Sequence, residues 1–150
     1  MILVLVDHDR GVLDPLSTRA LTAARKIDAD IQAVVIGAID VIGAGLATEV
    51  GKFGAKVLHV ANNPELNDYA PMATGRALAQ LADQLKPVAV IAAGSPRGNE
   101  QLAHLAAFKD LPMAAECTSI TLGNPHKVVR ARWGGNLLED ANVHADLLIA

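Results

Sequence analysis

Five short apolar runs recur along the chain at intervals of 26 to 31 residues. They begin at Ile2, Ile31, Val57, Val88 and about Cys117. Four of these runs are continuous aliphatic and β-branched segments, which is typical of strands buried on both faces of a parallel sheet. An interval of this length holds a strand, a crossover helix and two loops, as in a βαβ unit. The spacing therefore predicts that the first four strands are parallel.

The segments between these runs carry helix signals. Asp14 is placed as an N-cap, and Pro15 occupies the first helical position after it. Further helices are expected over 71–86 and 101–108, and a glycine-rich one over 42–54.

The end of the chain has a different pattern. Segments 116–122 and 127–133 read as strands with only four residues between them, which favours an antiparallel hairpin at the end of the sheet. A last strand is expected over 146–149. The sequence thus predicts a single α/β domain over residues 1–150, a three-layer α/β/α sandwich with a mostly parallel, doubly wound sheet and a C-terminal antiparallel hairpin.

Composition excludes several classes of protein. Apolar residues make up 51% of the chain and aromatic residues 3%, so the core must be aliphatic. The net charge of −3 does not favour nucleic-acid binding. The apolar stretch 31–47 is shorter than the ~20 residues of a membrane span and contains Asp40, so no membrane insertion is expected. Cys117 is the only cysteine, and no targeting peptide is evident, which favours the cytoplasm or, in a eukaryote, the mitochondrial matrix.

The loop after the first strand, Asp7 to Asp14, contains one glycine, so it has neither a dinucleotide fingerprint nor a P-loop. Asp7-His8-Asp9 lies where α/β sheets place ligands, yet it lacks the spacing of a metal-ligand set. Cys117 lies within an apolar strand and reads as a buried, inert thiol. We expect no catalytic residue and no metal site.

The turn after the fourth strand is the best candidate for an anion site. Ser95, Arg97, Gly98 and Asn99 combine small residues, a cation and a helix start, which together can hold a phosphate. The alternative is a turn that only caps a helix, with Ser95 or Asn99 as the cap. We favour this alternative because Glu100 would repel an anion.

Trp133-Gly134-Gly135-Asn136 is the best candidate for an interface. It contains the only tryptophan of the chain, followed by two glycines that permit unusual backbone angles or close approach. We expect this turn to pack against another domain or subunit. The alternative is that it closes the core of its own domain.

Three segments, in order, resemble the N-terminal domain of the electron transfer flavoprotein alpha subunit. They are residues 4–37, 94–120 and 129–137, where Arg130 and the turn 133–136 follow the family pattern. The chain departs from that pattern at Pro96, Asn99, His104 and Ala131. The resemblance implies an adenine-nucleotide-binding-like fold and a scaffold role in a heterodimer with the beta subunit.

The resemblance also implies that FAD is part of the full complex and is held mainly by a second domain that follows the last strand in the family. We therefore expect the chain to be a fragment of a longer subunit and to hold no FAD alone. Dehydrogenases and a quinone reductase would be partners through the complex. A stand-alone adenine-nucleotide-binding module of the universal-stress-protein type is the alternative, and a hydrolase using Asp7, His8 or Cys117 is a third.

Overall fold

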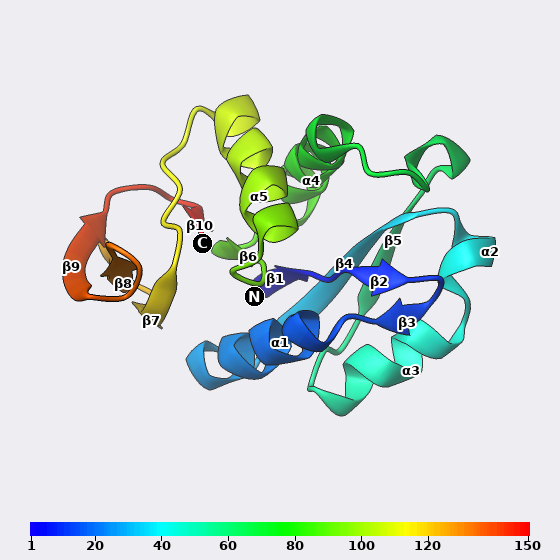
Figure 1. The fold of residues 1–150 in the computed structure, drawn as a ribbon, viewed down its shortest axis with the longest axis horizontal. Helices are drawn as coiled ribbons and strands as arrows, with labels where there is room; N and C mark the ends of the chain where they lie inside the picture. The colour runs from blue at the N-terminus through cyan, green and yellow to red at the C-terminus, as the bar shows by residue number, and fades with distance from the viewer.

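The computed structural model describes residues 1–150 and contains a five-stranded parallel sheet with helices on both faces (Figure 1). The strand order is β10-β6-β1-β4-β5. These strands are β1 (Ile2–Leu5), β4 (Ile31–Gly37), β5 (Leu58–Asn62), β6 (Ala89–Ile91) and β10 (Leu148–Ile149). The prediction that the first four strands of the sheet are parallel is confirmed.

Two helical layers cover the sheet, and β1 contacts both. Ile2 and Val4 point into a core shared with α1 (Pro15–Ile27), α2 (Ile39–Ile42) and α3 (Gly45–Lys52). Leu3 and Leu5 point into the opposite core, which contains α4 (Pro71–Leu85) and α5 (Pro96–Lys109). This alternation follows from the two-residue period of a strand and confirms the three-layer α/β/α sandwich.

The helix starts follow their capping residues. The Asp14 carboxylate accepts hydrogen bonds from the backbone N–H groups of Leu16 at 2.7 Å and of Ser17 at 3.4 Å. Ser95 caps α5, which therefore begins five residues earlier than the expected 101–108. The glycine-rich segment 42–54 does not form one helix. Gly43, with φ +72°, separates α2 from α3.

The C-terminal hairpin is confirmed, but its surroundings differ from the expectation. Strands β7 (Cys117–Thr121), β8 (His126–Arg132) and β9 (Leu137–Val143) form a separate antiparallel sheet, so the hairpin does not extend the parallel one. The edge next to β6 is filled by β10, whose outer side pairs with Met113. Strand β9 was not predicted, nor was the small hairpin of β2 (His8–Asp9) and β3 (Val12–Leu13).

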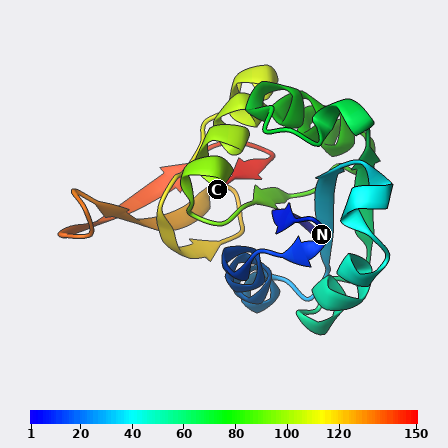
Figure 2. The ribbon, with the colours of Figure 1, turned by 45° about the vertical axis from the view of Figure 1, so that its right-hand side comes forward.

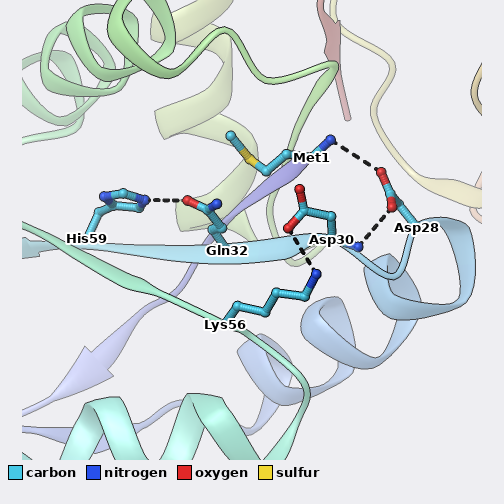
Figure 3. Close-up of polar contacts among 6 residues, drawn as sticks. All are labelled: Met1, Asp28, Asp30, Gln32, Lys56 and His59. Carbon is cyan, nitrogen blue, oxygen red and sulfur yellow. Dashed lines mark hydrogen bonds and ion pairs between the residues drawn. The ribbon is translucent and has the colours of Figure 1, made fainter.

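Polar contacts link neighbouring segments near the amino-terminal edge of the sheet (Figure 3). The amino group of Met1 lies 3.3 Å from the Asp28 carboxylate, and Lys56 lies 3.3 Å from Asp30. His59 and Gln32 are joined by a hydrogen bond of 2.6 Å. None of the helices combines the length and apolar character needed to cross a membrane.

Candidate functional site

The carboxyl ends of β1 and β6 meet at the point where the strand order reverses. From β1 the chain crosses to β4 on one side, and β6 later pairs with β1 on the other. Open α/β sheets bind ligands at such a switch point. The loop of Asp7 to Asp9 and the turn of Ser95 to Asn99, which the sequence places far apart, therefore lie next to each other.

Asp7 is the first residue of the site. Its backbone N–H donates to the Ser17 hydroxyl at 2.8 Å, which fixes it beside the first turn of α1. Burial raises the pKa of its carboxyl group above the ordinary value, although the nearby Arg97 guanidinium and the Gln101 amide lower it. Asp7 is therefore a carboxyl group held where ionisation is disfavoured.

His8 is oriented by the turn that joins β2 to β3. Its Nδ1 accepts the backbone N–H of Gly11 at 3.2 Å, so the ring proton belongs on Nε2. Arg10 and Gly11 have φ values of +46° and +82°. A Cβ on Gly11 would lie 2.5 Å from the Ile42 carbonyl oxygen, so only glycine fits. No group of three or more acidic, histidine or cysteine side chains is placed to hold a metal ion.

The polar groups of the predicted anion turn each have a partner within the chain. The Ser95 hydroxyl accepts the Gly98 N–H at 3.0 Å, and the Asn99 amide donates to Glu116 at 3.0 Å. Arg97 lies over the Tyr69 ring, with its guanidinium carbon 4.6 Å from the ring centroid. A Cβ on Gly98 would lie 2.2 Å from the Ala93 carbonyl oxygen. The glycine is therefore needed for the close approach of α5 to the loop that follows β6.

Tyr69 and Gln101 belong to the site but were missed by sequence reasoning. The Tyr69 hydroxyl donates to Glu100 at 2.6 Å. Burial and the Glu100 carboxylate raise the pKa of Tyr69 to about 12, so it remains a donor. Gln101 is 4% exposed, and its Oε1 has no hydrogen-bond partner. Neither residue lies in a recognisable motif, because only tertiary packing brings the loop before α4 and the helix α5 to Asp7.

Two cavities meet at this site. The smaller, of about 60 Å³, is lined by Asp7, Tyr69, Thr74 and Gln101 among others. The larger, of about 360 Å³, lies between the β2–β3 hairpin and the first turns of α1 and α5. Asp7, His8 and Arg97 line both cavities.

Cys117 lies away from this site, in a groove between α1 and β7. Its thiol donates to the Ala114 carbonyl oxygen at 3.2 Å, and burial raises the pKa of the thiol above its ordinary value. Two cavities in this groove, of about 310 Å³ and 550 Å³, both include Cys117 in their lining. This environment favours the unreactive thiol form.

The predicted interface turn forms the tip between β8 and β9, which projects from the body of the molecule (Figure 2). Trp133 is 80% exposed and has φ +50°. Gly134 and Gly135 follow with φ values of +62° and +88°. The Asn136 side chain donates to the Trp133 carbonyl oxygen at 2.8 Å. The tryptophan therefore does not close the core of the chain.

Comparison with known proteins finds relatives of two names, the FixB protein and the electron transfer flavoprotein subunit alpha. The FixB protein of Azorhizobium caulinodans is 26% identical over 90% of this chain and 38% of its own length. The electron transfer flavoprotein subunit alpha of Thermoanaerobacterium thermosaccharolyticum is 27% identical over 42% of its own length. The subunit alpha of Mycobacterium tuberculosis is 28% identical over 44% of its own length. The chain thus spans about two fifths of these relatives. Because the model of the electron transfer flavoprotein domain matches residues 2–148, the chain belongs to that family.

Proposed function

We propose that residues 1–150 are the scaffold and subunit-interaction domain of an electron transfer flavoprotein alpha subunit. The domain would pair with a beta subunit in a heterodimer. This complex would carry electrons from dehydrogenases through FAD to a quinone reductase, in the cytoplasm or the mitochondrial matrix. Family membership and the names of the alpha-subunit relatives support the proposal.

The exposed tip of the β8–β9 hairpin is the observation that carries the interaction role. Trp133, Leu137 and Leu138 are 80%, 50% and 70% exposed. Exposed apolar side chains gathered on one element mark interaction sites, and tryptophan is among the residues that contribute most to binding energy. An arm of this kind can insert an apolar anchor into a neighbouring subunit.

The tip is also held in one shape before binding. Three consecutive residues with positive φ form the turn, and Asn136 braces it. Glu139 of β9 lies 3.5 Å from Arg130 and 3.6 Å from Arg132 of β8, which links the two strands close to the tip. A preformed anchor loses less conformational entropy on binding.

The residues of the switch-point site do not fit FAD. Its pyrophosphate needs hydrogen-bond donors and cations. The larger cavity instead presents Asp7, Asp9 and Asp14, while the Gly98 N–H is used by Ser95 and Arg97 lies on Tyr69. We therefore propose that the flavin is held mainly by residues outside 1–150.

The test uses the electron transfer flavoprotein beta subunit of the same organism. The chain is labelled with 5-fluorotryptophan, which marks Trp133 alone because the sequence has one tryptophan. We expect its ¹⁹F resonance to move when the beta subunit is added, and calorimetry to show that Trp133→Ala weakens binding by roughly 30-fold, as for a hot-spot residue.

Phe108→Ala is the matched control, because Phe108 is another exposed aromatic side chain, 40% exposed, on α5. We expect this variant to bind like the parent chain. Equal binding by Trp133→Ala and the parent would contradict the role of the hairpin tip. Absence of any complex with the beta subunit would contradict the scaffold function itself.

The second candidate is an adenine-nucleotide-binding module. The position of the two cavities at the switch point favours it, whereas the carboxylates around them oppose a phosphate. Calorimetric titration with AMP and ATP separates the two functions. A dissociation constant below about 10 μM, near −7 kcal/mol, would favour the nucleotide module.

A further inference from the structure

The smaller switch-point cavity, of about 60 Å³, has walls of both apolar and polar residues. Leu5, Val6, Ile36, Leu66 and Ala70 contribute its aliphatic side chains. The polar residues of these walls come from four separate parts of the chain: the loop after β1, the loop before α4, and the helices α4 and α5. These residues are Asp7, His8, Asn67, Asp68, Tyr69, Thr74, Arg97 and Gln101.

One hydrogen-bond acceptor in these walls lacks a donor. Oε1 of Gln101 is buried and has no partner, and a buried acceptor left unpaired is costly. The neighbouring Asp7 carboxylate is half-buried, and the Gln101 amide is its hydrogen-bond partner within the chain. Asn67 Oδ1, by contrast, accepts the N–H of Ala38 at 2.8 Å. A ligand group that donates hydrogen bonds would therefore suit this cavity.

The charges around the cavity favour a cation. Asp7 and Asp68 line it, and Asp14 is near enough to raise the pKa of Asp7 further. Arg97 is the only lysine or arginine in the lining, and its guanidinium lies over Tyr69. An anionic head group would meet two carboxylates and a single guanidinium.

We propose that this cavity binds the primary ammonium head of a small ligand. The N–H groups of the head would be donated to Gln101 Oε1, to the Asp7 carboxylate and to the Thr74 hydroxyl. A volume of about 60 Å³ holds only a few water-sized groups, which suits such a head. The rest of the ligand would extend into the 360 Å³ cavity, which shares Asp7, His8 and Arg97.

The probe for this site is methylammonium chloride, titrated into the ¹⁵N-labelled chain and followed by NMR. Tetramethylammonium chloride at equal concentration is the control, because it has the same charge and no N–H group. We expect methylammonium to cause saturable shifts of the Gln101 side-chain amide and of the Asp7 and His8 backbone amides. We expect no such shifts with tetramethylammonium.

Two variants test the acceptors. Gln101→Leu removes Oε1 at similar size, and Asp7→Asn removes the charge. Each should weaken methylammonium binding about tenfold or more, the effect of losing a hydrogen bond to a charged group. Gln80→Leu, at an exposed position of α4, is the matched control and should bind like the parent chain.

Three results would refute the site. Equal shifts with both cations would indicate charge screening alone. Unchanged affinity in both Gln101→Leu and Asp7→Asn would remove the assigned acceptors. The absence of any saturable shift would mean that the cavity holds ordered water only. Each readout is made without the beta subunit, so failure here is distinct from failure of the scaffold function.

Discussion

Gly75 on α4 lies directly against His104 on α5. A Cβ added to Gly75 would lie 2.5 Å from the Cβ of His104 and 2.8 Å from the backbone nitrogen of Leu105. The two helices that form the layer over Leu3 and Leu5 can approach this closely only because position 75 has no side chain. The same layer positions Thr74 and Gln101 at the switch-point site.

We expect Gly75→Ala to destabilise the chain by about 1–3 kcal/mol, because the extra methyl group must force the helices apart. The control is Gly51→Ala in α3, where a new Cβ meets nothing within 4 Å. That change should be neutral or stabilising by up to roughly 1 kcal/mol, since alanine favours a helix over glycine. Urea unfolding of both variants measures the difference. Equal effects at the two positions would disprove the close α4–α5 contact.

Asp7 should make stability depend on pH. Its pKa in the folded chain is raised above the unfolded value, chiefly by burial. The native state therefore binds this proton more tightly than the unfolded state. The stabilisation that protonated Asp7 provides is complete below the unfolded pKa and is lost as pH rises through the folded pKa.

Asp7→Asn should accordingly be more stable than the parent chain at neutral pH, and this advantage should vanish near pH 3. Thermal unfolding measured across this pH range gives the comparison. Asp40→Asn, at an exposed position of α2, is the control and should show no such pH-dependent gain. A parent chain that is more stable than Asp7→Asn at pH 7 would contradict the burial argument.

The main sheet could be predicted because its strands are buried on both faces. Ile2, Leu3 and Val4 are all 0% exposed, so their segment is continuously apolar and recognisable. Strand β9 has no such pattern. Leu137 and Leu138 at its start are exposed, and Glu139 and Asp140 follow them. Pairing with β8 makes this segment a strand, and a single sequence does not display that pairing.

The candidate site could be predicted only in its local parts. Ser95 is a possible helix cap and Asp7 follows a clearly apolar strand, so the sequence indicates both loops, although it places the helix after Ser95 too late. Tyr69 lies in an irregular loop, and Gln101 resembles any glutamine on a helix. Their roles arise from tertiary contacts across the switch point, as with Arg97 over Tyr69. Such contacts cannot be predicted from the spacing of residues along the chain.

Cys117 should react slowly with thiol reagents in the folded chain. Burial raises the pKa of its thiol, so at neutral pH the reactive thiolate is less populated than in a free cysteine. Reaction with Ellman's reagent at pH 7 should be slower than that of free cysteine and should become comparable in denaturant. Arg130→Ala should slow it further, because Arg130 lowers this pKa. A folded chain that reacts as fast as free cysteine would contradict this assignment.

The chain of residues 1–150, purified alone, should not retain FAD in a one-to-one ratio. A tight flavin site needs placed donors for the pyrophosphate and a surface on which the rings can stack. The switch-point cavities are lined by carboxylates, and the four aromatic side chains, Phe53, Tyr69, Phe108 and Trp133, lie on separate segments. Tyr69 is already covered by Arg97. Aliphatic surface alone cannot orient the ligand, and binding must also offset several kcal/mol of lost translational and rotational freedom.

The measurement is an absorption spectrum after incubation with FAD and desalting. Recovery of about one flavin per chain would show that these residues form a cofactor site.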